Sequence, residues 1–438
     1  MRRIVLLIIL LTWACRAFGR AESRCTLVKN ARIYALGEKN VLDPGMILIS
    51  GGKIEGIGPN LDAPVDCVIL DLGGKTIIPG LVCPSASLFL RPKDAQYQGE
   101  ESPDADILDG LDPFDPTDGG LVRNGVTTVH FGLRSYQAIG GLGAVVKLKG
   151  DGRAPFEVIR ARASLRMRLE RLQDRKTSNV QRLVQFEGIR RLFLDALEYR
   201  KMWLASGRRP KDVPKDDKGP EPPTRNESKE VLLQVLDGKI PLRLEAHRPD
   251  AILNALRLGE EFGIDITLEG CESWPDVLPG LPKAPARLLS NFLADPARFL
   301  VPGRGKGYAA NRLKVGEGAL FYTDDVGSFH EAPTAEDFRG LKERGTTFVL
   351  VPPDDLPLSA GGMRVYAALL VNRGVPELEA MKAVTIDAAR ALGVEGRIGS
   401  LEKGKDADFV ILDGPPLNTL SRVEQVYIGG TVVWERPR

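Results

Sequence analysis

The sequence predicts an α/β protein in which a parallel sheet of βα units is joined to a small antiparallel sheet domain. Three patterns lead to this prediction. Residues 25 to 75 show short strands separated by glycine pairs, residues 76 to 396 alternate apolar runs with helical stretches, and strand patterns return from 397 to 438. With 438 residues, 43% of them hydrophobic, the chain can bury the core of one large domain and a smaller one.

The first 21 residues do not belong to the predicted fold. Arg2 and Arg3 precede an apolar run from Ile4 to Leu11, and small residues follow up to Ala21, which is the pattern of a cleaved secretory signal. The run is short for a membrane span, and no later segment is long and apolar enough to be one. We expect export to the periplasm or the cell exterior, with a retained anchor or a lipid-modified Cys15 as the alternatives.

The net charge bears on the class of partner, and the cysteines bear on the compartment. Removal of the signal takes away four of the 60 basic residues and none of the 58 acidic ones, so the formal net charge goes from +2 to −2. Such a balance gives no indication of nucleic-acid binding. Cys25 and Cys67 both lie on predicted strands of the N-terminal segment. We expect a disulfide between them in an oxidising compartment, with two free thiols as the alternative.

The small domain is expected to be discontinuous in the sequence. Its N-terminal part has period-two apolar runs separated by turns such as Gly51-Gly52 and Gly73-Gly74, a pattern typical of hairpins. Its C-terminal part repeats that pattern around Gly429-Gly430 and is expected to complete the same sheet. The expected strands are Thr26–Val28, Met46–Ile49, Lys53–Ile57, Val68–Leu72, Phe409–Leu412, Val423–Ile428 and Thr431–Trp434.

Between these parts, short apolar runs separated by helical patterns indicate a parallel sheet, whose chemistry is expected where its strands end. The candidate strands are Ile77–Val82, Thr127–Phe131, Ala144–Leu148, Pro241–His247, Asp265–Glu269 and Thr347–Val351.

One region, residues 151 to 235, fits this pattern poorly. Residues 156 to 205 predict long charged helices, and a charged, proline-rich stretch that cannot bury much apolar surface follows. We interpret the region as a helical insertion with a flexible linker. The insertion either covers the ends of the barrel strands or forms a solvent-exposed helical segment, and the sequence leaves both alternatives open. The helical face is expected to carry Leu183, Phe186, Phe193 and Leu197.

Long motifs stand at both ends of the chain: Leu27–Arg32, Gly52–Gly58, Asp71–Val82, Thr385–Gly393 and Arg397–Val410. They resemble those of the amidohydrolase superfamily, and within it the imidazolonepropionase-like branch. The resemblance covers nearly the whole mature chain and is weakest in the insertion.

This resemblance implies a (β/α)8 TIM-like barrel with a small composite β-sandwich domain. It also implies one or two divalent metals, zinc among them, that activate water to attack a non-peptide C–N bond. Such chemistry needs several His or carboxylate ligands that converge on an open coordination position, because a strongly bound cation lowers the pKa of water to about 7. The identity of the residues at the ligand positions is therefore decisive.

The first of these positions have lost their histidines. The family's first strand ends in His-x-His, where alternate side chains point to one side, but this chain has Ser85 and Ser87, and a serine hydroxyl is a poor zinc ligand. On the fifth strand, Glu245 stands where the family has its metal-binding His, and His247 matches a neighbouring His that is not a ligand. We expect Glu245 to pair with Arg243 or His247 inside the barrel.

The later strands show the same loss. The resemblance places Gly270 where the family's sixth strand has a His, between Glu269 and Cys271; Cys271 is either a thiolate ligand or a buried apolar residue. For the family's last-strand Asp, which orients the water, we favour Asp354 by its context and keep Asp324 as the alternative. Only three histidines are present in the whole chain, so the family's four-His site cannot be built.

Two hypotheses follow from these positions. The first is an exported amidohydrolase-fold protein that has lost metal-dependent hydrolysis, needs no cofactor and binds a small molecule or a partner through the old pocket or the insertion. The second is an active hydrolase with a rebuilt site, in which Glu245, His247 and Asp354, with Glu269 or Cys271, hold one metal or act as acid and base. A purely structural role is a third alternative. One cavity at the strand ends is expected to be ringed by Ser85, Ser87, Glu245, Gly270 and Asp354.

Overall fold

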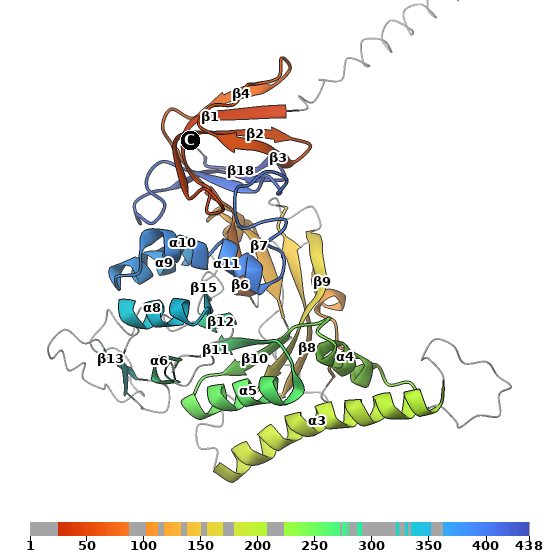
Figure 1. Cartoon of the computed structure of the whole chain (residues 1–438). Helices are drawn as coiled ribbons and strands as arrows, with labels where there is room; N and C mark the ends of the chain where they lie inside the picture. The colour runs from red at the N-terminus through yellow and green to blue at the C-terminus, as the bar shows by residue number, and fades with distance from the viewer. Residues whose placement is uncertain are drawn as a thin grey trace, which may run out of the picture.

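Figure 1 shows the fold of the chain in a computed structural model. The described residues are 25–86, 102–112, 118–132, 138–149, 156–169, 179–207, 223–271, 274–277, 279, 287–290, 321–323, 329–331, 334–351 and 362–437.

Strands from the two ends of the chain form one sheet, at one end of the molecule in Figure 1. Its hydrogen-bonded order is β18-β17-β16-β5-β1-β2-β3, with β4 paired to β1, so the C-terminal strands join the N-terminal ones through the antiparallel pair β5 and β16. The discontinuous sheet expected from the sequence is thus observed. Its strands are β1 (Cys25–Tyr34), β2 (Val41–Ser50), β3 (Lys53–Gly58), β4 (Val68–Asp71), β5 (Thr76–Pro79), β16 (Phe409–Leu412), β17 (Val423–Ile428) and β18 (Thr431–Glu435).

The expected disulfide is present. Cys25 opens β1, and it is bonded to Cys67, which precedes β4; the two Cα atoms are 4.8 Å apart. This separation lies within the usual range for disulfides. Cys83 and Cys271 are buried free thiols.

The second large sheet is that of the barrel. Its eight strands follow the order β15-β12-β11-β10-β9-β8-β7-β6, and every adjacent pair is parallel except the two that involve β8. Helix α11 (Ile386–Ala391) packs against both β6 and β15, the end strands of this order. The strands are β6 (Leu81–Ala86), β7 (Val126–Phe131), β8 (Ile139–Lys147), β9 (Glu157–Arg168), β10 (Leu242–Ala246), β11 (Ile266–Gly270), β12 (Arg287–Ser290) and β15 (Thr347–Leu350).

Helices and two short strands complete the described chain. Helix ends follow local signals: α5 has Pro249 in its first turn and left-handed Gly263 at its end, and a capping box of Thr334 and Asp337 begins α8. The elements are η1 (Ile107–Asp109), α2 (Asp118–Val122), α3 (Asn179–Ala205), α4 (Glu227–Leu236), α5 (Pro249–Phe262), α6 (Trp274–Val277), β13 (Phe321–Thr323), β14 (Phe329–Glu331), α8 (Ala335–Glu343), α9 (Met363–Asn372) and α10 (Glu377–Ala383).

The pleat of the barrel strands separates apolar from charged side chains. Leu242, Leu244 and Ala246 of β10 lie in one apolar cluster with buried residues of α5. Because side chains alternate along a strand, Arg243 and Glu245 point to the other side, into the barrel. The same alternation in β9 and β11 places further charged residues inside, and this positions the candidate site.

The helices expected over residues 156 to 205 are wrong for the first part of that range. Residues Glu157–Arg168 form β9, which pairs with β8 and β10 in the barrel sheet. In the part of the expected insertion that the structure describes, the helices are α3 and α4. Of the expected helical face, Phe193 is buried, Phe186 and Leu197 are half-buried, and Leu183 is 66% exposed. The other buried residues of α3 are Ile189, Ala196, Tyr199 and Trp203.

The expected barrel strand Ile77–Val82 is two strands. Residues up to Pro79 belong to β5 in the composite sheet, and those from Leu81 belong to β6 in the barrel sheet. Gly80 lies between them, with its N–H donated to the carbonyl of Asp408. The apolar run continues through this junction, so hydrophobicity alone does not show where the chain changes sheets. The domain boundaries at residues 75 and 396 stay predictions.

Within the described residues, no helix has the length and apolar character needed to cross a membrane.

A buried ion cluster joins the two sheets. The ammonium of Lys147, at the end of β8, lies 2.9 Å from a carboxylate oxygen of Asp406 and 2.9 Å from one of Asp408, just before β16. All three side chains are almost fully buried. Arg397 also contacts Asp406, at 2.8 Å. The cluster ties the antiparallel strand of the barrel to the composite sheet.

Replacing Lys147 with Met should therefore lower the free energy of unfolding by about 3 kcal/mol, because it leaves Asp408 buried without its cation. Urea unfolding followed by circular dichroism measures the change. The matched control is Lys201→Met on α3, whose side chain is 74% exposed and pairs with Glu198, so it should change stability by less than about 0.5 kcal/mol. Equal midpoints for the two variants would show that the buried cluster does not stabilise the fold.

Candidate functional site

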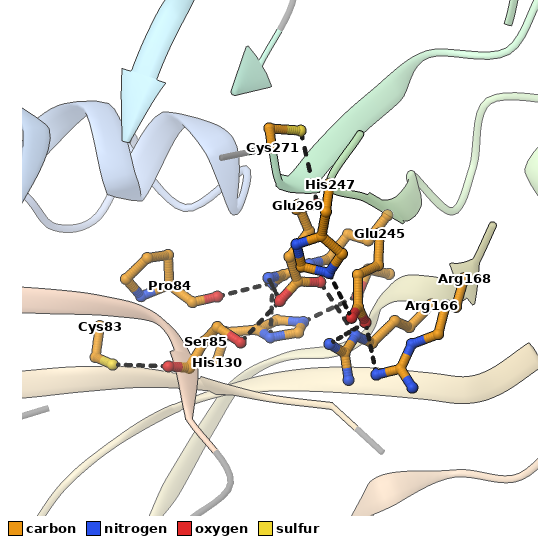
Figure 2. A network of polar contacts seen from close by, with 12 residues as sticks. Cys83, Pro84, Ser85, His130, Arg166, Arg168, Glu245, His247, Glu269 and Cys271 are labelled. Carbon is orange, nitrogen blue, oxygen red and sulfur yellow. Dashed lines mark hydrogen bonds and ion pairs between the residues drawn. The ribbon is translucent and has the colours of Figure 1, made fainter. Parts of the chain in front are cut away.

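Polar side chains from five of the barrel strands meet toward the carboxyl ends of those strands, as Figure 2 shows. We call this group the strand-end cluster. In a barrel of parallel strands, this is the end at which active sites lie. The cluster consists of Ser85 on β6, His130 on β7, Arg166 and Arg168 on β9, Arg243 and Glu245 on β10, His247 just after β10, and Glu269 on β11.

Glu245 is held by three cationic or donor groups. Its Oε2 lies 2.8 Å from Nη2 of Arg166 and 2.9 Å from Nη2 of Arg168, and its Oε1 lies 3.1 Å from Nε2 of His247. Figure 2 shows the four side chains turned toward one another. The expected pairing of Glu245 with His247 is observed, whereas Arg243 pairs with a different carboxylate.

That second carboxylate is Glu269. Its Oε2 accepts a hydrogen bond from Nε of Arg166 at 3.1 Å, and its Oε1 accepts one from the Ser85 hydroxyl at 2.9 Å. Nη2 of Arg243 lies 3.1 Å from the same Oε1. Arg166 therefore bridges the two glutamates, and all four of their carboxylate oxygens have a close partner.

The inner part of the cluster is anchored by Arg243. Its Nη1 donates to the carbonyl of Pro84 at 2.7 Å and lies 2.8 Å from Nδ1 of His130. The other ring nitrogen of His130 lies 2.9 Å from the hydroxyl of Ser164. Burial, and then the charge of Arg243, lower the pKa of His130 well below its ordinary value, so this imidazole is neutral at pH 7.

His247 lies at the edge of the cluster, with a 17% exposed side chain, over a glycine. A Cβ at Gly270 would lie 2.5 Å from Cε1 of His247, and the backbone of Gly270 has a φ of +86°. Both the conformation and the space therefore require glycine. The imidazole of His247 fills the volume that a side chain at position 270 would take.

The arginines keep both carboxyl groups ionised. Burial alone would raise the pKa of Glu269, but the guanidinium groups of Arg166 and Arg243 outweigh it and lower that pKa to about 2. Burial likewise opposes ionisation of Glu245, and Arg166 together with His247 and Arg168 holds its pKa well below the usual range.

The donor set of the cluster does not fit the divalent metal that the resemblance implies. A metal site needs several free His, Cys or carboxylate donors, whereas here three guanidinium groups surround two carboxylates. Within the described ranges, no group of three or more such donors is placed to hold a metal ion. A cation brought to Glu245 or Glu269 would also be repelled by the arginines.

The expected site residues have different outcomes. Ser85, Glu245, His247 and Glu269 come together, and Gly270 lies beneath His247. Cys271 is buried, and its thiol lies 3.6 Å from the carbonyl of Glu269. Ser87, Asp354 and the alternative Asp324 lie outside the described residues, so the expected ring of five residues stays a prediction.

Sequence reasoning missed Arg166 and Arg168, because residues 156 to 205 were expected to be helical. A signal was present: from Ile159 to Arg168, apolar residues alternate strictly with Arg or Ser. That period of two predicts a half-apolar strand and would have placed both arginines inside the barrel.

A groove of about 550 Å³ lies at the opposite end of β15, between α8, α9 and α10. It is lined by Phe338 and Phe348, among others, and contains no member of the strand-end cluster. The candidate chemistry therefore does not lie in this groove.

Comparisons with known proteins agree with this architecture. The model of the Amidohydrolase family matches residues 322–433. An amidohydrolase from Thermotoga maritima has a similar structure, with a TM-score of 0.74 and 27% identity over 94% of this chain and all of that chain. These matches support the amidohydrolase superfamily. The fold of the chain is accordingly the TIM-like barrel with an additional β domain.

Within the superfamily, the chain is similar to the imidazolonepropionases. It is 48% identical over 50 residues to that of Syntrophobacter fumaroxidans, and 33% identical over 99 residues to that of Thermoplasma volcanium. These stretches cover only 12% and 24% of the two proteins. A prolidase structure with a TM-score of 0.50 and 15% identity shows a likeness of fold alone.

The position of His247 over Gly270 can be tested with Gly270→Ala. This variant should lose about 2 kcal/mol more stability than Gly263→Ala, because both add strain at positive φ but only position 270 adds a clash with the imidazole. A Cβ at Gly263 meets no atom within 4 Å, which makes it the matched control. Urea unfolding measures the difference, and equal losses would contradict the packing of His247 described above.

Because Glu269 is buried and ionised, we expect the free energy of unfolding to decrease at low pH. Its pKa in the folded state is about 2, below its ordinary value near 4.5, so its contribution is complete above pH 4.5 and is lost as the pH falls through 2. The loss is on the order of 3 kcal/mol. Glu269→Gln should be less stable at pH 7 and should lose less stability between pH 4.5 and 2 than the wild type.

The exposed Glu55→Gln is the control for this comparison and should keep the acid dependence of the wild type. The measurement is the free energy of unfolding in urea at successive pH values. Parallel curves for Glu269→Gln and the wild type would rule out a buried, ionised Glu269.

Proposed function

We propose that this protein is an exported member of the amidohydrolase superfamily that has lost metal-dependent hydrolysis and serves as a binding protein for a small molecule. One observation carries the proposal: the carboxylates of Glu245 and Glu269, at the former ligand strands, are fully engaged by arginines, His247 and Ser85.

The energetics support this interpretation. To coordinate a metal, Glu245 would have to leave Arg166 and Arg168, two buried guanidinium groups. Breaking a buried ion pair costs several kcal/mol, because it leaves an unpaired buried charge. The added divalent cation would then raise the positive charge of a site that already contains three arginines. Replacement of the first-strand histidines by Ser85 and Ser87 agrees with the same conclusion.

Export is supported by two independent features. The N-terminal residues have the composition of a secretory signal, and Cys25 is bonded to Cys67. Structural disulfides persist in oxidising compartments and are rare in the cytosol. These features support our proposal that the protein is exported to the periplasm or the cell exterior.

A second candidate function is hydrolysis by a rebuilt site without a metal. It is favoured by the partly exposed His247, whose Nε2 lies 3.1 Å from Oε1 of Glu245. A carboxylate orients and charges an imidazole in this way in many acid–base catalysts. The substrates would be C–N bonds of the kind that the superfamily cleaves.

The metal content of the purified protein distinguishes both candidate functions, binding and metal-free hydrolysis, from metal-dependent hydrolysis. The exported protein, purified without chelator, should contain well below one equivalent of zinc, manganese and iron, and it should not hydrolyse N-acyl amino acids, dipeptides or lactams. Near-stoichiometric metal with a hydrolysis that chelation abolishes would overturn the proposal. Metal-free hydrolysis that His247→Gln abolishes would favour the second candidate.

A further inference from the structure

A cavity of about 420 Å³ lies where the barrel meets the composite sheet. Its walls come from the turn between α2 and β7, the first turn of α9, the segment between β16 and β17, the start of β17, and the end of β18 with the residue after it. We call it the junction cavity. β7 begins beside the first of these walls, at Val126, and reaches the strand-end cluster at His130. The junction cavity therefore lies near the other end of that strand and shares no lining residue with the cluster.

Four arginines line the junction cavity, and its described lining contains no aspartate or glutamate. Arg123 and Arg422 are exposed and form no ion pair with any residue that the structure describes. Arg436 lies 3.8 Å from a carboxylate oxygen of Asp413, and a partly exposed pair at this distance contributes little. The fourth arginine is Arg364. Because a guanidinium has five N–H donors and no acceptor, the cavity offers a ligand donors from four separate segments of the chain.

Arg364 is held in place by backbone carbonyls rather than by a carboxylate. Its Nε donates to the carbonyl of Pro416 at 2.7 Å, and its Nη2 donates to those of Asn418 and Ser421 at 3.2 Å and 3.1 Å. Its Nη1 forms no hydrogen bond within the described part of the chain, so this donor is available to a ligand. Burial lowers the pKa of Arg364 and the charge of Asp413 opposes this shift, so an anion in the cavity would stabilise the charged guanidinium.

We propose that the junction cavity binds the phosphate group of a small phosphorylated molecule, with Arg364 as its fixed contact and the other three arginines around it. A phosphate monoester has three terminal oxygens and a charge of about −1.5 to −2 at pH 7, so several guanidinium groups can donate to it at once. A carboxylate has two oxygens in one plane, and a single guanidinium fork occupies both. Four guanidinium groups in one cavity therefore favour the phosphate. The inference does not depend on the loss of metal-dependent hydrolysis, because the cavity is separate from the strand-end cluster.

The shape of the cavity and its other walls favour a small molecule over an anionic membrane. Its volume lies within the usual range of small-molecule pockets. Trp434 of β18 and Leu417 are half-buried and line it, so a ring or chain attached to the phosphate would meet apolar surface beside the arginines. A flat membrane surface would meet the exposed Arg123 and Arg422, but it would not fill the cavity around the half-buried Arg364.

The test is titration calorimetry of the whole protein with inorganic phosphate, and with acetate as the carboxylate probe. Both are measured at pH 7 and at equal ionic strength, set with sodium chloride. Phosphate should bind with one equivalent per chain. Acetate should bind about tenfold more weakly or not at all, because it loses at least one charge-assisted hydrogen bond.

Substitutions locate the binding. The double variant of Arg123→Gln and Arg422→Gln removes two exposed guanidinium groups, so it should weaken phosphate binding by about tenfold or more and leave the melting temperature unchanged. The matched control combines Arg191→Gln and Arg257→Gln, at two exposed positions of α3 and α5 outside the cavity. It changes the net charge equally and should bind phosphate like the wild type. Arg364→Gln should also weaken binding, and its three lost backbone contacts should lower the melting temperature.

Four results of the calorimetry would overturn the inference: no phosphate binding by the wild type, acetate bound as tightly as phosphate, an unchanged phosphate affinity in the double variant, or an equal loss in its control. Vesicles that contain phosphatidic acid distinguish a lipid headgroup from a small molecule. We expect no more sedimentation of the protein with them than with phosphatidylcholine vesicles. Sedimentation that free phosphate does not diminish would assign the arginines to a membrane surface instead. Metal content and hydrolysis bear on the proposed function alone, so the two failures are distinguishable.

Discussion

The bridge that Arg166 makes between Glu245 and Glu269 is the interaction on which the site depends. One guanidinium contacts carboxylates from two neighbouring strands, at 2.8 Å and 3.1 Å, and so fixes the interior faces of β9, β10 and β11 relative to one another. Glu245 then positions His247, and Glu269 positions Ser85. A side chain of the protein thus connects the three strands.

The contacts in the strand-end cluster also make the identities of some residues depend on one another. An arginine inside the barrel needs a carboxylate partner. Replacing either Arg166 or Glu245 alone would therefore leave the other with one fewer partner for its buried charge. Gly270 is likewise linked to His247, because any side chain there would meet the imidazole. The residues that differ from the family pattern therefore form one consistent set of contacts, in which each charged group has an opposite charge or a hydrogen-bond partner close by.

Much of the fold was predictable from the sequence, and less of the site was. Glycine-separated apolar runs gave the composite sheet, and Cys25 and Cys67 were correctly paired because both lie on its strands. The expected strands Pro241–His247 and Asp265–Glu269 are observed as β10 and β11, with Glu245 on β10 and Gly270 at the end of β11. Arg166 and Arg168 were missed because a charged segment was interpreted as helical, although its period of two indicated a strand. The passage of the chain from one sheet to the other at Gly80 was not predictable, because the apolar run continues through it.

Because β8 runs antiparallel to its neighbours, it links the strand-end cluster to the composite sheet. Ile139, at its start, pairs with Met167 beside Arg168, and Lys147, at its end, lies against Asp406 and Asp408 of the composite sheet. One strand of nine residues therefore runs from the edge of the strand-end cluster to the junction with the other sheet. A shift of β8 along its own axis would move a guanidinium at one end and break an ion pair at the other. The composite sheet thus acts as an anchor that holds the interior of the barrel in register.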